Sequence, residues 1–505
     1  MKNINTIKVE SEVKGTNKFL NNLYTATSKG RTENDAVTFT RSGSPLLDFF
    51  AQGGAMRKNP DKALELFKKA FAEDREKAIR ILFYFRDIRG GQGERTLFRV
   101  GLEWLGTTYP TIFETIVKHV PEYGRWDDVL FDNDKCFELI HTQLIEDKES
   151  ETPSLLAKWL PTINASSKTT RAKARFVAEK LGYGEVEYRK TLKEIRKTIK
   201  TVEAQMSARK WEDIDYSHVP SQASRIYRNA FSKHDEVRYG NFIEKAEKGE
   251  EKINAGTLYP YQIYNTVRND YSQTLEALWN QLPDYTQGKN ALVVADVSGS
   301  MGGDPMSVSV SLALYFAERN TGQFKDHFIT FSGNPTLQRI VGENLQDKMN
   351  SIQRSNWEYN TNLQAVFDLL LNTAVANNTP RDELPETIYI ISDMEFDEAT
   401  STRSHWYDEV KSEATNYEEI ERKYADAGYT KPNIVFWNVD ARGGDNLPVQ
   451  AGTVGVSLVS GFSPSVFKMA VENKTPEEVM LDTINSERYS PIVLRNENKT
   501  PTTSK

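Results

Sequence analysis

Residues 291–300 read ALVVADVSGS, a continuous apolar run that ends in Asp296, Ser298 and Ser300. Such a run is typical of a buried parallel strand, which delivers the side chains after it to the carboxyl edge of the sheet, where α/β folds bind ligands. The carboxylate and the two hydroxyls are spaced two residues apart on a turning loop, so they can face one point. All three are hard oxygen donors, the ligand type that Mg²⁺, Mn²⁺ or Ca²⁺ prefers.

The pattern around this stretch alternates between strands and helices from residue 289 onward. Further apolar, strand-like runs lie at 327–333, 386–393, 432–440 and 452–461, with helical runs between them. This alternation predicts an α/β domain over residues 289–470, a doubly wound, Rossmann-like fold with a parallel sheet covered by helices on both faces. Residues 471–505 are predicted to form one more helix and an extended tail.

The chain before residue 289 has a different pattern. Over residues 44–288 the apolar residues recur at helical spacing, and short turns containing Gly, Pro or Asn separate the helical runs. Helices of this kind favour antiparallel pairs and a HEAT-like repeat module, although no strict sequence period is present. Residues 1–43 are polar and rich in Thr, Asn and Ser, which predicts an N-terminal arm, either loose or strapped over the helices.

The composition is that of a soluble protein of several domains: 505 residues, 38% hydrophobic and 27% charged. Cys136 is the single cysteine, which excludes a disulfide framework and favours a reducing compartment such as the cytoplasm. With six histidines, a zinc site of the Cys/His type is also disfavoured. The sequence has neither a membrane-spanning run nor a signal peptide at its start. We therefore expect a cytoplasmic, monomeric protein without membrane partners.

Two later residues extend the candidate metal site. Asp393 ends the apolar run 386–393, and Thr361 lies where a loop enters a helix. Together with Asp296, Ser298 and Ser300 they offer two carboxylates and three hydroxyls. A hard divalent ion held by this set would keep several waters and an open coordination position, which could accept a carboxylate or a phosphate from a partner. The alternative for the first triplet is a plain strand-to-helix turn in which the serines cap a helix.

The complete set resembles the metal-ion-dependent adhesion site (MIDAS) of a von Willebrand factor A domain, and residues 289–470 resemble that fold. The resemblance assigns Asp296, Ser298 and Ser300 to the first motif, Thr361 to the second and Asp393 to the third. It implies a bound divalent cation, with Mg²⁺ the first choice and Mn²⁺ or Ca²⁺ as alternatives.

Short phrases in the helical half resemble the TROVE module of Ro-type ribonucleoproteins, and are closest to the Ro-like proteins of bacteria, phages and plants. These phrases are DIRGGQGER (87–95) and those at 159–182, 187–196, 219–231 and 252–263. A TROVE module followed by a von Willebrand A domain is the order in that family. The resemblance implies a ring of helical repeats closed by the α/β domain. It also implies that single-stranded ends of misfolded RNAs enter the ring and that small non-coding RNAs bind its outer face.

Residues 155–210 carry nine Lys and five Arg against five Glu, a local charge of +9 in a chain whose net charge is −7. A basic stripe of this density attracts phosphates and predicts salt-dependent RNA binding. The predicted RNA-binding residues are Lys168, Arg171, Lys173, Arg175, Arg189, Lys190, Lys193 and Lys197. The alternative is a solvated helix face. Trp159, Tyr183 and Tyr188 could stack on bases, although core packing is the favoured interpretation for each of them.

From these features we expect an RNA-binding scaffold that is not an enzyme, with a metal site in the α/β domain that recruits an acidic protein ligand or steadies the closure of the ring. One alternative is a metal-dependent protein-binding module without RNA. Another is a metal-dependent phosphatase using Asp296 and Asp393. The phosphatase is disfavoured because phosphoaspartyl enzymes usually need a second acid two residues after the nucleophile, where this chain has Ser298.

Overall fold

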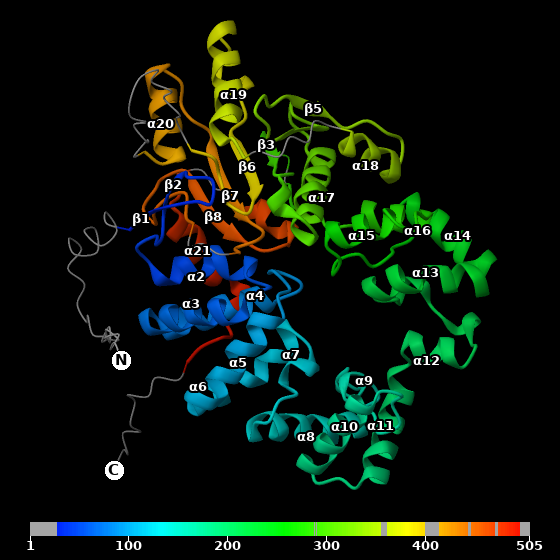
Figure 1. The fold of residues 1–505 in the computed structure, drawn as a ribbon. Coiled ribbons are helices and arrows are strands. Elements are labelled where there is room, and N and C mark those ends of the chain that lie inside the picture. Colours follow the sequence, from blue (N-terminus) through cyan, green and yellow to red (C-terminus); the bar gives the residue numbers. More distant parts are fainter. Residues whose placement is uncertain are drawn as a thin grey trace, which may run out of the picture.

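The computed structural model describes residues 28–286, 288, 290–354, 361–398, 414–442, 446–469 and 473–494. The chain has two parts, a helical module followed by a part built on a six-stranded mixed sheet (Figure 1). This confirms the predicted order of a helical half before an α/β half.

The helical module is a succession of short and medium helices. They are α2 (Pro45–Gln52), α3 (Pro60–Glu73), α4 (Arg75–Arg86), α5 (Thr96–Thr108), α6 (Pro110–Ile116), α7 (Val120–Tyr123), α8 (Asp134–Glu149), α9 (Leu156–Trp159), α10 (Lys168–Lys180), α11 (Glu185–Ile199), α12 (Val202–Ser207), α13 (Ser221–His234), α14 (Glu236–Glu247), α15 (Pro260–Val267) and α16 (Gln273–Asn280). The start of α3 shows why they form: Pro60 occupies the first turn and the Asn59 side chain accepts a hydrogen bond from the Lys62 amide. Its buried face is the apolar stripe that helical spacing predicts.

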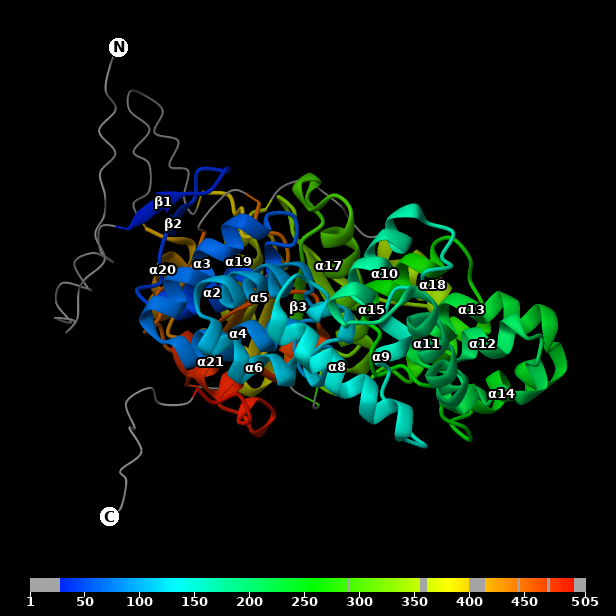
Figure 2. The same cartoon turned by 90° about the horizontal axis from the view of Figure 1, so that it is seen from below.

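These helices form an arc that both begins and ends on the α/β part (Figure 1). At the start of the arc, α2 packs against the sheet strand β8 (Val456–Ser460), and at its end α15 packs against α17 (Asp304–Arg319). Viewed from below, α12, α13 and α14 lie at the end of the molecule remote from the hairpin of β1 (Lys29–Arg31) and β2 (Val37–Phe39) (Figure 2). The described residues therefore form a closed path of helices and sheet.

The sheet has the strand order β5-β4-β3-β6-β7-β8. Its strands are β3 (Ala291–Ala295), β4 (His327–Thr330), β5 (Leu337–Arg339), β6 (Thr387–Ser392), β7 (Asn433–Asn438) and β8. The strands that correspond to the five predicted runs pair in parallel. The additional edge strand β5, which was not predicted, pairs antiparallel with β4 and makes the sheet mixed. The first strand, β3, lies in the middle, and the chain adds strands on one side and then on the other. In such doubly wound sheets the ligand crevice lies at the carboxyl ends of the two strands where the direction changes, here β3 and β6.

The remaining helices surround the sheet. They are α17, α18 (Leu345–Gln353), α19 (Leu363–Asn377), α20 (Asn416–Asp426) and α21 (Pro476–Ile484). Helix α17 packs on β3 and β6, and α19 packs against α20. The predicted C-terminal helix corresponds to α21, which joins the two parts by contacting β8 as well as α2 and α4.

The described part of the predicted N-terminal arm begins with a small hairpin of β1 (Lys29–Arg31) and β2 (Val37–Phe39). This hairpin packs on the α/β part. It therefore differs from one of the two predicted arrangements, in which the arm is strapped over the helices of the helical module. Phe39 exchanges backbone hydrogen bonds with Leu447, and β-bridges join Asp35 to Asp397 and Val37 to Thr415. Residues 1–27 of the predicted arm lie outside the described residues.

Within the described part of the chain, no helix combines the length and the apolar character that crossing a membrane requires.

Candidate metal site and cationic cavity

Two carboxylates emerge from neighbouring strands at the point where the sheet changes direction. Asp296 directly follows β3 and Asp393 directly follows β6, and these strands pair in parallel with Ala295 opposite Ile391. Both side chains therefore leave the same carboxyl edge of the sheet. Asp296 is 0% exposed and Asp393 is 2% exposed, so neither charge is solvated by bulk water.

The surroundings of Asp296 hold its carboxylate rigidly. One oxygen accepts a hydrogen bond from the Ser298 amide at 2.9 Å, and the other accepts from the Ser392 hydroxyl at 2.6 Å. Burial, and then the negative charge of Asp393, raise the pKa of Asp296 to about 6. Two buried carboxylates that repel each other favour a proton or a cation between them. The site is thus suited to positive charge.

The two serines of the first motif are not helix caps. Their hydroxyls lie 2.8 Å apart and hydrogen-bond to each other. Ser298 precedes the short 3₁₀ turn Gly299–Met301 without a side-chain capping bond, and the N-cap position of α17 is Gly303. The capping alternative is therefore wrong for this turn, and each hydroxyl retains oxygen lone pairs for another ligand.

Thr361, the second-motif residue, is buried beside the loop that follows β6. Its hydroxyl lies 2.7 Å from the Glu395 carbonyl oxygen and 3.0 Å from Oδ1 of Asp397. The same loop starts at Asp393, whose Oδ1 accepts a hydrogen bond from the Glu395 amide at 3.3 Å. The structure thus joins Asp296 with Ser298, Ser298 with Ser300, and Thr361 with the Asp393 loop.

Sequence reasoning missed several polar residues around this edge. Arg442 donates to Oδ2 of Asp393 at 3.3 Å and to Oδ2 of Asp440, also at 3.3 Å. Glu395 is buried, accepts from the Asn446 side chain at 2.7 Å, and has its pKa raised chiefly by that burial. The acidic run DMEFDE at 393–398 was the available sequence signal, although nothing in it indicates which acids turn inward.

The donor chemistry fits a hard cation. Among the described residues, no three His, Cys, Asp or Glu side chains are grouped so as to hold a metal ion. The set predicted from the sequence has two carboxylates and three hydroxyls. It therefore contains only two side chains of the types in that count, because Ser and Thr are not among them. Hard divalent ions such as Mg²⁺ bind through one or two carboxylates and complete their shells with hydroxyls and water. Asp296, Asp393, Ser298 and Ser300 supply such donors. Thr361 is held instead by Asn34, Glu395 and Asp397, and within the described part of the chain no hydrogen bond joins it to the other four residues.

A second feature is a cavity of about 870 Å³ on the helical module. Its wall comes from segments far apart in the chain, including the residues after α2, the α4–α5 connection, α9, α13 and the start of α15. The cationic residues in the wall are Arg57, Arg86, Arg95, Arg125 and Lys158, and the aromatic ones are Trp159, Tyr227, Tyr259 and Tyr261. Of these, Trp159 and Arg95, the last residue of the phrase 87–95, were singled out from the sequence.

The cations of this cavity differ in how they are neutralised. Arg86 is buried in an ion pair with Asp128, so it is a structural residue. Arg57 pairs with Glu94 at 3.1 Å and Lys158 pairs with Glu203 at 3.3 Å.

Two arginines of the cavity retain donors. Arg95 is exposed, and no described acidic residue forms an ion pair with it. Arg125 pairs through Nε with Asp127 at 3.4 Å, and its guanidinium lies 4.3 Å from the ring centroid of Trp159. Its Nη2 is buried without a described hydrogen-bond partner. The buried hydroxyl of Tyr259 is likewise unpartnered among the described residues. These groups are ready donors for an anion that enters the cavity.

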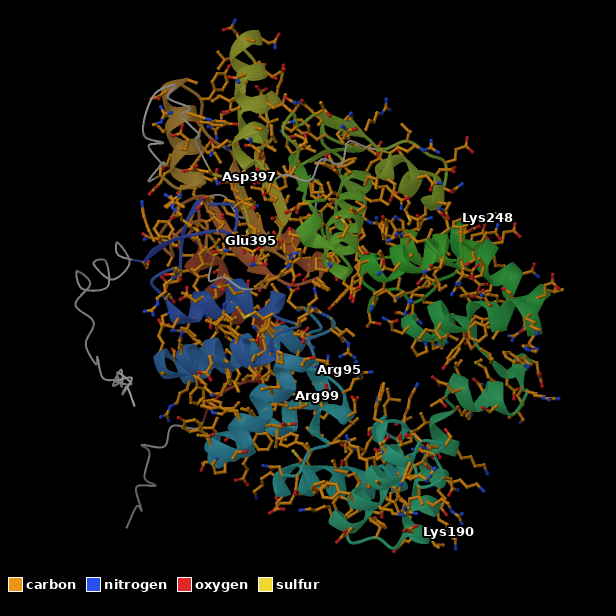
Figure 3. All side chains as sticks on the ribbon, in the orientation of Figure 1. Arg95, Arg99, Lys190, Lys248, Glu395 and Asp397 are labelled. Carbon is orange, nitrogen blue, oxygen red and sulfur yellow. The ribbon has the colours of Figure 1, made fainter. Side chains whose placement is uncertain are left out.

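The RNA-binding residues predicted from the sequence lie elsewhere, on α10 and α11. Arg171 donates to the carbonyl oxygens of Ala165 and Ser166, and Arg175 pairs with Glu185 at 2.9 Å, so these two are committed to local structure. The other six are exposed on the surface: Lys168, Lys173, Arg189, Lys190, Lys193 and Lys197. In Figure 3, Lys190 lies on the lower rim of the arc, whereas Arg95 lies on its inner side. The chain therefore has two separate basic surfaces.

Comparisons with known proteins match both parts of the chain. Residues 290–504 match the family described as "Domain of unknown function (DUF7788)", and residues 32–122 and 138–295 match "Domain of unknown function (DUF2828)". A relative, the uncharacterized protein L728 of Acanthamoeba polyphaga mimivirus, is 27% identical over 518 residues, which cover 92% of this chain and 89% of the relative. The chain is thus similar to this viral protein across the helical and the α/β parts.

Proposed function

We propose that this chain is an RNA-binding scaffold of the Ro type, in which the helical module binds single-stranded or small non-coding RNA. The observation that carries the proposal is the cationic cavity enclosed by the arc of helices. It combines guanidinium groups with Trp159 and three tyrosines. Basic groups that meet phosphates, beside aromatic rings on which bases stack, are the two components of sequence-tolerant single-strand binding.

The exposed lysines of α10 and α11 supply a second surface for RNA. Lys190, Lys193 and Lys197 share one helix face, and all three are exposed. Such a face suits the phosphates of a structured RNA, which is bound largely through its backbone and shape. In this proposal the cavity takes single strands and the rim takes folded RNA.

The α/β part is proposed to be a von Willebrand A domain that carries a MIDAS-type site. Support comes from its strand order and from the two carboxylates at the switch point between β3 and β6. Asp296, Ser298, Ser300, Thr361 and Asp393 would hold a divalent cation, which supplies a Lewis-acidic position for an acidic ligand. We place the protein in a reducing compartment such as the cytoplasm, because its single cysteine is a buried free thiol.

Filter binding of single-stranded RNA at two salt concentrations tests the RNA part. The proposal expects binding at low salt that weakens as salt rises, because cations released from RNA phosphates drive the association. Absence of binding at low salt refutes it. For the metal, retention of a protein partner from nuclease-treated lysate that is lost on chelation would favour the protein-binding alternative.

A further inference from the structure

We infer that Asn34, in the turn of the β1–β2 hairpin, positions the hydroxyl of Thr361 for the divalent cation, so that the N-terminal hairpin is a working part of the metal centre. The inference rests on the metal site proposed above and adds a residue that lies 327 positions away from Thr361 in the chain. Asn34 is a positioning residue in this scheme and does not bind the metal itself.

The turn of the hairpin is attached directly to the loop that follows β6. The Thr32 hydroxyl donates to the Phe396 carbonyl oxygen at 2.7 Å, and the Glu33 amide donates to Oε2 of Glu395 at 2.7 Å. A β-bridge between Asp35 and Asp397 continues the attachment. Figure 3 shows Glu395 and Asp397 beside this hairpin. The turn of the hairpin thus contacts, along its length, the loop that begins at the candidate ligand Asp393.

Asn34 uses both protons of its side-chain amide on this loop and on the candidate ligand. Nδ2 of Asn34 lies 3.0 Å from Oγ1 of Thr361 and 2.7 Å from the carbonyl oxygen of Glu395. An amide nitrogen has only donors, so Oγ1 of Thr361 must be the acceptor in the first of these bonds. The amide therefore fixes where one lone pair of the threonine oxygen points.

The remaining valences of the Thr361 hydroxyl follow from its surroundings. Its single proton has two acceptors within reach, the Glu395 carbonyl oxygen at 2.7 Å and Oδ1 of Asp397 at 3.0 Å. When these two acceptors share the proton in a three-centre bond and Asn34 takes one lone pair, the other lone pair of Oγ1 is left for a cation. The Thr361 amide also donates to Oδ2 of Asp397 at 3.2 Å, which fixes the backbone. Asn34 thus fixes the orientation of the Thr361 hydroxyl, which could otherwise rotate about its Cβ–Oγ1 bond.

The size of the effect follows from the general behaviour of partners that orient metal ligands. Their loss typically costs about 10- to 100-fold in metal affinity. Asn34 is an exposed residue and acts on one ligand of five, so we expect the lower end, about tenfold. Its exposure also means that the substitution leaves the apolar core untouched.

The test measures Mn²⁺ affinity of the full-length protein by the electron paramagnetic resonance signal of free Mn²⁺. We expect Asn34→Ala to weaken binding about tenfold, whereas Thr38→Val should leave it within about twofold. Thr38 is the matched control because its hydroxyl also fastens the hairpin, donating to the Leu447 carbonyl oxygen at 3.0 Å. Equal Mn²⁺ affinity in Asn34→Ala and Thr38→Val would overturn the inference while leaving the metal site intact. A wild-type protein that binds no Mn²⁺ would refute the metal site, and the inference with it.

Hydrogen exchange gives a second measurement, which would not depend on the metal if Asn34 had a purely structural role. Linkage is reciprocal, so if the hairpin strengthens metal binding, the metal must strengthen docking of the hairpin. Addition of Mg²⁺ should slow exchange of the backbone amides in residues 32–36 of the wild type and of Thr38→Val, but not of Asn34→Ala. Slowing of the same size in all three proteins would show that Asn34 does not carry the coupling.

Discussion

The substitution Arg95→Ala tests where single-stranded RNA binds. Arg95 lines the cavity, is exposed, and has no ion pair with a described residue, so its removal neither unpairs a carboxylate nor opens the core. A cation that neutralises one phosphate of a single strand contributes about 0.7 to the slope of log affinity against log salt. At about 0.1 M salt, loss of that contribution weakens binding about fivefold.

The salt dependence gives a sharper measure than affinity at one condition. If Arg95 and Arg125 each meet a phosphate, wild-type affinity falls about sevenfold between about 50 and about 200 mM salt. With one contact left in Arg95→Ala the fall is about 2.6-fold. Fluorescence anisotropy of a short labelled single strand, titrated at four salt concentrations, resolves these slopes.

Variants of the rim provide the matched control. The triple substitution of Lys190, Lys193 and Lys197 by alanine removes three exposed positive charges from α11 and leaves the cavity unchanged. It should keep the wild-type slope for the short single strand. An unchanged slope in Arg95→Ala together with a reduced slope in the triple variant would refute the cavity and place single strands on the α10–α11 surface.

Three further predictions concern the metal site and the core. Asp296→Asn should abolish the increase in melting temperature that Mg²⁺ gives the wild type, read by differential scanning fluorimetry; a retained increase would contradict the assignment. Asp128→Ala should lower the free energy of unfolding by about 3–5 kcal/mol in urea titrations, because it leaves Arg86 buried without its partner; a change below about 1 kcal/mol would show that water replaces the carboxylate. Cys136 is buried, and burial raises the pKa of its thiol, so thiol reagents at pH 8 should label it only after denaturation; rapid labelling of the native protein would contradict its burial.

The positions of the two carboxylates of the candidate metal site could be predicted because each depends on a short local pattern. A buried strand that ends in an acid determines which sheet edge the acid occupies, and this holds for Asp296 and for Asp393. The environment of Thr361 could not be predicted in the same way. Its partners lie on the β1–β2 hairpin and on the loop after β6, and a single sequence has no local signal for contacts between them.

The cavity was missed for a related reason. Its cations are scattered from Arg57 to Lys158, and of these only Lys158 falls within the basic region 155–210. The density of charge drew the prediction to residues 155–210, where the lysines lie on exposed faces of α10 and α11. Strand β5 was missed because its three residues, Leu337–Arg339, form a short edge strand that is largely exposed.

The carboxyl edge of the sheet also contacts the start of the helical module. At the end of β8, the Ser460 hydroxyl accepts from the Gly54 amide at 3.0 Å and donates to the Phe50 carbonyl oxygen at 2.9 Å. A Cβ at Gly54 would lie 2.8 Å from the Ser460 carbonyl oxygen, so the contact requires glycine.

The same edge connects the candidate metal site to that module through charged side chains. Lys58 pairs with Asp440 at 3.1 Å, and Asp440 in turn accepts from Arg442, which also donates to Asp393. Lys58 directly follows Arg57, a residue of the cavity wall. Ion pairs therefore run from the candidate cation ligand Asp393 through Arg442 and Asp440 to Lys58, the residue next to Arg57 of the cavity wall. A cation at Asp393 would compete with Arg442 for the same carboxylate. A cation at the candidate site would thus loosen the Arg442–Asp393 pair and change the charge around Asp440, which holds Lys58 of the segment after α2.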